Sequence, residues 1–194
     1  MTDADLPRAG GRRLLSMQRL RDAALPLVAE RGIDEIRAED LAEALGISRR
    51  TFFRYFPVKE DVVVGAFAEI GVRLASASRE MTAGGPFDID AMKGLLTEAT
   101  RDGEFYGSGG RARFALILET PALRARFLGL LEDIAERLAR SLAAAGAPAA
   151  RSSLFVRLTL TLLVEATDRW SKDAARPIAD QVDALIGETR LAMR

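Results

Sequence analysis

The residues best suited to specific chemistry are concentrated between Gly46 and Phe56. This segment combines a glycine, a serine, two consecutive arginines and several aromatic side chains. Guanidinium groups form paired hydrogen bonds with phosphate oxygens and with guanine edges, so arginines at the start of a helix suit nucleic-acid recognition. The segment therefore predicts a DNA-recognition helix.

The residues before this segment predict a first helix that must position it. Leu41, Ala42 and Leu45 share one helical face, and Gly46 can adopt the left-handed conformation that ends a helix. Ser48 has the side chain of a helix N-cap, because its oxygen accepts hydrogen bonds from amides two or three residues later. We therefore expect a second helix to begin directly after Ser48.

The second helix is expected to have an inner and an outer side. Phe52 and Phe56 are four residues apart and are predicted to anchor the inner side. The residues left for the outer side are Arg49, Arg50, Thr51 and Phe53. Two packed helices joined by a short glycine-containing turn form a helix-turn-helix, whose second helix enters the major groove of DNA.

Cations at helix starts support this interpretation, because the partial positive charge of a helix N-terminus favours carboxylates instead. Arg49 and Arg50 open the recognition helix, Arg37 precedes an acidic turn, and Lys59 opens the following helix. A DNA phosphate would satisfy both the helix amides and the cation. The open alternative is a set of solvated surface charges, balanced locally by Glu39, Asp40, Glu60 and Asp61.

Between about Leu20 and Val64 the chain resembles the N-terminal domain of the TetR family of bacterial transcriptional repressors. The residues that carry the resemblance are Arg31-Gly32, Leu41-Ala42, Leu45-Gly46-Ile47-Ser48, Thr51-Phe52-Phe53, Tyr55-Phe56 and Lys59-Glu60-Asp61. The resemblance implies a homodimer with two DNA-binding domains and a larger, variable helical domain that binds a small effector. The DNA-binding residues predicted from motif and resemblance together are Arg37, Ser48, Arg49, Arg50, Thr51, Phe53, Tyr55 and Lys59.

Three positions depart from the family pattern. Arg37 replaces a common threonine cap, which costs the helix about 1 kcal/mol of capping. Phe53 replaces a common tyrosine, which removes a donor for phosphate and leaves an apolar face for a thymine methyl group or a sugar. Val58 replaces a frequent serine or threonine, so the fourth helix is expected to start without a side-chain cap.

The composition narrows the range of functions. The chain contains no histidine and no cysteine, which excludes the usual zinc sites, disulfides, and catalysis by either side chain. No phosphate-binding loop or nucleophile elbow is present, so we expect neither an enzyme nor a cofactor. The formal net charge is zero, yet residues 8–59 hold eleven Arg or Lys against seven Asp or Glu. This surplus of cations suits a DNA-facing domain.

No stretch approaches the roughly 18 apolar residues of a membrane span, and the polar start of the chain is unlike a signal peptide. We therefore expect a cytoplasmic protein with no membrane partner. Residues 1–15 are expected to form a flexible basic arm. Arg12 and Arg13 would reach the minor groove or a phosphate, or would belong to a solvated tail.

The pattern predicts an all-α protein with a helix-turn-helix domain over residues 16–58 and a larger helical effector-binding and dimerisation domain over residues 59–194. Pro26 is expected to kink the first helix. The expected helices outside the helix-turn-helix pair cover residues 16–31, 59–81, 88–100, 111–118, 121–145, 148–172 and 177–193. A glycine-rich connector or lid is expected at residues 103–110, which lack the lysine of a nucleotide-binding loop.

The long helix between Arg151 and Trp170 is apolar around nearly its whole circumference. Such a helix must be buried on two sides, and the last helix carries a single apolar stripe. We therefore expect both helices to form a symmetric dimer interface. The predicted interface residues are Leu160, Val164, Ile178, Val182, Leu185 and Ile186. The alternative is burial of the long helix within one monomer.

The family's architecture suggests an apolar cavity for a hydrophobic or amphipathic effector between the middle helices. The predicted lining is Phe114, Leu118, Phe127, Leu131, Phe155, Thr159, Leu162 and Trp170, each of which would also serve as ordinary core. Glu165 would anchor a cationic ligand, or would simply pair with Arg169 four residues later.

These observations predict a dimeric, ligand-responsive DNA-binding regulator. It would be a repressor released from a palindromic operator when an effector changes the spacing of the two recognition helices. The main alternative is a helical small-molecule binding protein that has lost operator binding. A carboxylate-dependent enzyme is a more distant alternative.

Overall fold

A computed structural model describes residues 9–80, 87–101 and 109–192, and these residues form helices and their connections without any strand. The predicted all-α fold is therefore confirmed over the described part of the chain. The helices are α1 (Ala9–Arg31), α2 (Ala38–Ala44), α3 (Arg49–Tyr55), α4 (Asp61–Val64), the 3-10 turn η1 (Gly65–Phe67), α5 (Ala68–Glu80), α6 (Ile89–Thr100), α7 (Gly110–Glu119), α8 (Pro121–Ala144), α9 (Ala149–Lys172) and α10 (Ile178–Ala192).

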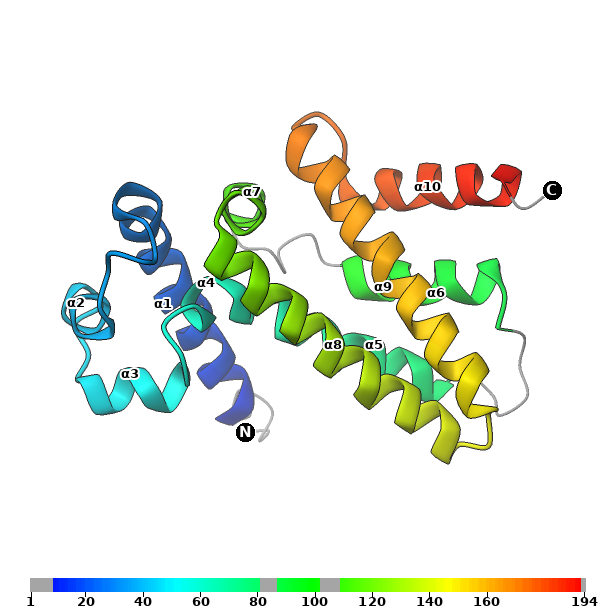
Figure 1. Ribbon diagram of the computed structural model, residues 1–194, viewed down its shortest axis with the longest axis horizontal. Helices are drawn as coiled ribbons and strands as arrows, with labels where there is room; N and C mark the ends of the chain where they lie inside the picture. The colour runs from blue at the N-terminus through cyan, green and yellow to red at the C-terminus, as the bar shows by residue number, and fades with distance from the viewer. Residues whose placement is uncertain (1–8, 81–86, 102–108, 193–194) are drawn as a thin grey trace, which may run out of the picture.

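Helices α1 to α3 lie at one end of the molecule, and α6, α9 and α10 lie at the other (Figure 1). Helix α8 runs from the neighbourhood of α4 and α7 into this second group, where it packs along α9. Of the two long helices of the body, α8 therefore begins beside α4, whereas α9 begins at the far end of the body (Figure 1).

The turn between α2 and α3 has the predicted geometry. Gly46 has a φ of 65°, and the amide of Ile47 donates to the carbonyl of Ala42 at 3.0 Å. The Ser48 hydroxyl oxygen accepts a hydrogen bond from the Thr51 amide at 3.1 Å, which confirms the N-cap of α3. Phe52 is fully buried, like the other predicted anchor, Phe56. Local sequence signals thus fix where α3 begins and which side faces inward.

The start of α2 shows how the missing threonine is compensated. Arg37 occupies the N-cap position, and its side chain makes no capping hydrogen bond, as expected for a group without an acceptor. The Asp40 carboxylate instead accepts a hydrogen bond from the Arg37 amide at 3.1 Å. Half of a capping box therefore remains, supplied from inside the helix.

Two expected boundaries were wrong. Helix α1 begins at Ala9 instead of residue 16, so the backbone of residues 9–15, which were expected to belong to the arm, is helical. The expected helix over residues 59–81 is divided into α4, the turn η1 at Gly65, and α5. Within this division, α4 starts at Asp61, whose carboxylate accepts a long hydrogen bond of 3.4 Å from the Val58 amide.

The remaining helices begin and end within two residues of the expected positions. The Asp88 carboxylate accepts hydrogen bonds from the amides of Asp90 and Ala91, at 3.0 and 2.9 Å, and so caps α6. Helix α8 has Pro121 at its first position, where a missing amide hydrogen costs nothing. Most of the glycine-rich segment expected at residues 103–110 lies outside the described residues.

Candidate DNA-binding surface and effector groove

The outer side of α3 carries exposed guanidinium groups. Arg49 and Arg50 are both exposed at the start of the helix. The Arg49 Nε lies 3.0 Å from the Glu39 carboxylate, and its guanidinium lies 5.7 Å from the ring centre of Phe53. Arg50 forms no ion pair or hydrogen bond with any residue that the structure describes. The helix therefore presents one cation held by a neighbouring carboxylate and one that is available.

The other predicted contacts on α3 differ in how freely they could meet DNA. Phe53 is exposed, whereas Thr51 and Tyr55 are half-buried. The hydroxyl oxygens of Ser48 and Thr51 lie 2.9 Å apart and share one hydrogen bond. Sequence reasoning passed over Arg54, which is exposed and stacks over the Tyr55 ring at 5.1 Å. Its spacing of four residues from Arg50 was the signal for a shared helical face.

Lys59 has a role within the protein that the sequence did not reveal. Its ammonium group donates to the carbonyl oxygens of Ile36 and Asp34, at 2.9 and 3.3 Å. These bonds tie the start of α4 to the loop before α2. An ammonium group has three N–H donors, so one remains for a phosphate. Arg37 is exposed beside this loop, with its Nε 3.7 Å from the Asp40 carboxylate.

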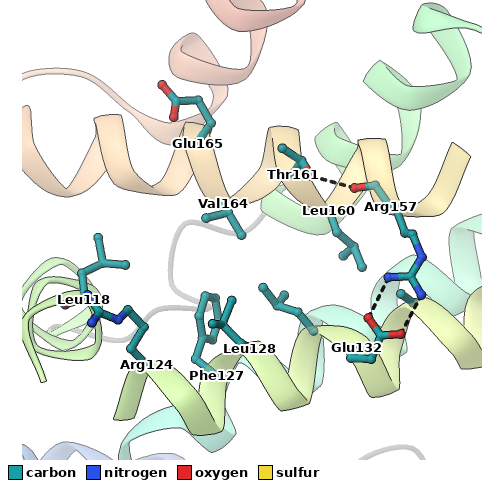
Figure 2. A pocket seen from close by; sticks show the side chains of 12 residues that line it. Leu118, Arg124, Phe127, Leu128, Glu132, Arg157, Leu160, Thr161, Val164 and Glu165 are labelled. Atoms are coloured by element: carbon teal, nitrogen blue, oxygen red, sulfur yellow. Dashed lines mark hydrogen bonds and ion pairs between the residues drawn. The ribbon is translucent and has the colours of Figure 1, made fainter. Parts of the chain in front are cut away.

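An apolar groove of about 410 Å³ opens between α8 and α9 (Figure 2). Leu118 closes the end nearest α7, and Phe127 points up into the groove from α8. The full lining is Leu118, Arg124, Phe127, Leu128, Leu131, Glu132, Ala135, Arg157, Leu160, Thr161, Val164 and Glu165. Three of the predicted effector residues, Leu118, Phe127 and Leu131, are thereby brought together.

The inner end of the groove is almost completely filled by side chains. Phe67, Phe114 and Phe127 form an aromatic cluster there, with ring centres 5.0 to 5.9 Å apart. The free space between these residues and α9 is about 10 Å³, which is at the lower limit for one water molecule. Phe114 therefore lines only this inner end, where a ligand would have to displace a side chain.

Four predicted lining residues lie outside both cavities. Phe155 packs against Phe87, with the two ring centres 4.8 Å apart. Thr159 is buried, and its hydroxyl group donates to the Phe155 carbonyl oxygen at 2.8 Å. Trp170 lies under the guanidinium of Arg111 at 4.3 Å, and Leu162 is half-buried. The groove side of α9 is instead marked by residues 157, 160, 161 and 164, which recur at helical spacing.

The residues predicted for the dimer interface are mostly buried in their own chain. Leu160, Ile178, Val182, Leu185 and Ile186 belong to the core, while Val164 is half-buried and lines the groove. At these positions, burial within the chain matches the alternative, in which the long helix is packed inside one monomer. The large apolar side chains that α9 leaves exposed are Leu154, at 61%, and Leu158, at 39%.

Ion pairs hold the rim of the groove. Arg157 donates to both carboxylate oxygens of Glu132, at 2.7 and 2.6 Å, and so joins α9 to α8. This bond lowers the pKa of Glu132 below its ordinary value. Glu165 pairs with Arg169 at 2.8 Å, as expected for the simple helix pair, and Arg169 also binds Glu188 at 2.7 Å.

Three ion pairs connect the N-terminal helices to the body. Arg113 of α7 binds Asp22 of α1, Arg126 of α8 binds Asp61 of α4, and Arg21 of α1 binds Glu69 of α5, at 2.7 to 2.8 Å. The hydrogen bond to Asp61 raises the pKa of Arg126 above its ordinary value. The Arg21 and Arg113 side chains are buried, whereas their carboxylate partners Glu69 and Asp22 are partly exposed to water.

The described residues contain no helix that combines the length and apolarity needed to cross a membrane. Within the same residues, no cluster of three or more acidic side chains is arranged to hold a metal ion.

Comparisons with known proteins match both the N-terminal helices and the fold. The family described as "Bacterial regulatory proteins, tetR family" matches residues 20–66. TcmR of Streptomyces glaucescens, an HTH-type transcriptional regulator, is 34% identical over 148 residues, which cover 71% of this chain and 65% of TcmR. MftR of Mycobacterium tuberculosis is 31% identical over 137 residues, which cover 69% of each chain.

Among solved structures, the fatty acid degradation regulator FadR from Bacillus halodurans superposes with a TM-score of 0.52. It shares 20% sequence identity, and the match covers 89% of this chain and 93% of FadR. At this identity the likeness concerns the fold alone. The helix-turn-helix geometry, the family match and the relatives agree, and the chain belongs to the TetR family of bacterial regulatory proteins.

Proposed function

We propose that the protein is a DNA-binding transcriptional repressor that uses α3 as its recognition helix. The observation that carries the proposal is the exposure of Arg49 and Arg50 on a capped helix whose opposite side is fixed in the core by Phe52 and Phe56. Cations at the start of an anchored helix are well placed to contact bases and phosphates. The relatives TcmR and MftR, both named as transcriptional regulators, support the same function.

The predicted contacts divide into two groups. Arg37, Arg49, Arg50 and Phe53 are exposed and would meet DNA directly, together with Ser48 and Thr51 at the start of α3. Tyr55 and Lys59 are half-buried, and we assign them to positioning on the phosphate backbone, which carries no sequence information. Glu39 must release Arg49 when DNA binds, so part of the binding energy replaces an existing ion pair.

We propose a homodimer formed through the exposed side of α9. Leu154 and Leu158 are one helical turn apart on this side, and exposed apolar side chains arranged in this way favour association. A twofold dimer would place two copies of α3 on successive major grooves. Leu154→Glu and Leu158→Glu should yield monomers in sedimentation velocity, whereas Val72→Glu on α5, at a still more exposed position, should leave a dimer. A wild-type monomer at micromolar concentration would refute this interface.

We further propose that the groove between α8 and α9 binds a small effector that releases DNA. The residue before Phe114 is Arg113, and the residue before Phe127 is Arg126, so two groove residues neighbour two arginines that bind α1 and α4. A ligand that displaces either ring and shifts its helix would also shift the arginine next to it. Such a ligand shifts the equilibrium only by its differential affinity for the two states, about 1 to 3 kcal/mol for typical coupling.

Selection from a random-sequence duplex library tests the DNA-binding proposal, because the library contains every short operator. The full-length protein should enrich a palindrome whose half-sites lie about one helical turn, or a multiple of it, apart. Absence of any enriched sequence would favour the alternative, a small-molecule binding protein without an operator. The observation that favours this alternative is that Arg49 and Lys59, two of the cations expected to contact DNA, already bind groups within the protein.

A further inference from the structure

The charged residues around the groove are not equivalent, because most of them already satisfy one another. Glu132 and Arg157 form a bidentate ion pair with two hydrogen bonds, and Glu165 pairs with Arg169. Arg124 lies at the end of the groove nearest α7 and has no carboxylate partner among the residues that the structure describes. It is therefore the cation of the lining whose charge remains uncompensated.

The bonding of Arg124 leaves it able to receive a ligand. The single hydrogen bond of its side chain in the described structure is donated by Nη1 to the Leu118 carbonyl oxygen, at a long 3.3 Å. A guanidinium group has five N–H donors in one plane, so four remain for an anion. The side chain rises from α8 toward Leu118, at the end of the apolar space (Figure 2).

We propose that the effector is an amphipathic anion, with an apolar or aromatic body between α8 and α9 and a carboxylate, sulfonate or phosphate group bound by Arg124. This inference rests on the effector groove of the proposed function and adds the chemical class of its ligand. Leu128 and Phe127 would contact the body of the ligand directly beside the anion site. The charge complementarity favours an anion, because a cationic ligand would have to separate Glu132 or Glu165 from an arginine.

Two fluorescent probes that differ in one group test this inference. 1-Anilinonaphthalene-8-sulfonate carries a sulfonate, and N-phenyl-1-naphthylamine has the same aromatic body without it. We expect the Arg124→Ala change to weaken binding of the sulfonate on the order of tenfold, because a charge-assisted hydrogen bond is lost. Binding of the neutral probe should stay unchanged. Arg140→Ala, on the same helix but outside the groove, is the matched control for net charge.

A third variant establishes where the probes bind. Thr161 is exposed on the α9 side of the groove, so Thr161→Trp should fill the groove and weaken both probes while the protein remains folded. If Thr161→Trp weakens both probes but Arg124→Ala affects them equally or not at all, the anion site is overturned and the effector groove stands. If Thr161→Trp affects neither probe, the groove itself is not the ligand site, and the effector part of the proposed function fails with it.

Discussion

The ion pair between Asp22 and Arg113 is expected to stabilise the protein strongly, and Asp22→Asn tests this. The pair joins α1 to α7 at 2.8 Å, and the Arg113 side chain is 2% exposed while that of Asp22 is 30% exposed. Loss of one partner from a fully buried pair costs about 3 to 5 kcal/mol. Because Asp22 is partly hydrated and asparagine still accepts a hydrogen bond, we expect a loss of about 2 to 3 kcal/mol.

Asp183→Asn is the matched control. Asp183 pairs with Lys93 at 2.7 Å, nearly the same distance, but the two side chains are 61% and 43% exposed. An exposed pair of this kind contributes about 0 to 1 kcal/mol, since water screens both charges. The comparison therefore isolates the effect of burial from that of geometry.

Urea unfolding followed by circular dichroism measures both variants. The midpoint of Asp22→Asn should fall at an unchanged m value, and its Tm should fall by about 5 to 10 °C for a chain of this size. The control should unfold like the wild type. If the free energies of unfolding of the two variants differ by less than about 0.5 kcal/mol, the buried pair does not hold α1 to α7. The proposed route from the groove to the DNA-binding helices then loses its main support.

Two further predictions concern the turn before α3 and the ion pair between Glu132 and Arg157 at the rim of the groove. Gly46 has a φ of 65°, so Gly46→Ala should cost about 1 kcal/mol in urea unfolding, whereas Gly94→Ala inside α6, where the added methyl group meets open space, should gain about 0.5 to 1 kcal/mol. The bond from Arg157 lowers the pKa of Glu132, so its stabilising effect is complete above the unfolded pKa of about 4.3 and disappears as the pH falls through the lower folded value. Glu132→Gln should therefore show a weaker loss of Tm between neutral and acidic pH than the wild type, and equal profiles would contradict the role of this pair.

Signals that act within a few residues made the DNA-binding region predictable. Gly46 and Ser48 define the turn and the cap by their own backbone and side-chain chemistry. Phe52 and Phe56 are buried because their spacing matches one helical turn. The bonds of Lys59 to Asp34 and Ile36 were not predictable in this way, since they join residues 25 and 23 positions apart.

In the body, one sequence pattern allows two different neighbours. The apolar residues of α9 had to be buried, but periodicity does not say whether their own chain or a partner covers them. Leu160 was therefore assigned to the dimer although it lies in the core and lines the groove. The break at Gly65 was missed for a related reason: the apolar residues before and after it are compatible with a continuous helix.

The salt dependence of DNA binding tests the central claim most directly. Fluorescence anisotropy with a selected palindromic duplex should show affinity that falls linearly on a logarithmic salt scale for the wild type. The double variant Arg49→Ala with Arg50→Ala should bind much more weakly and with a shallower slope, while Arg140→Ala on α8 should match the wild type. A double variant that is folded and binds the duplex with unchanged affinity and slope would show that α3 does not contact DNA.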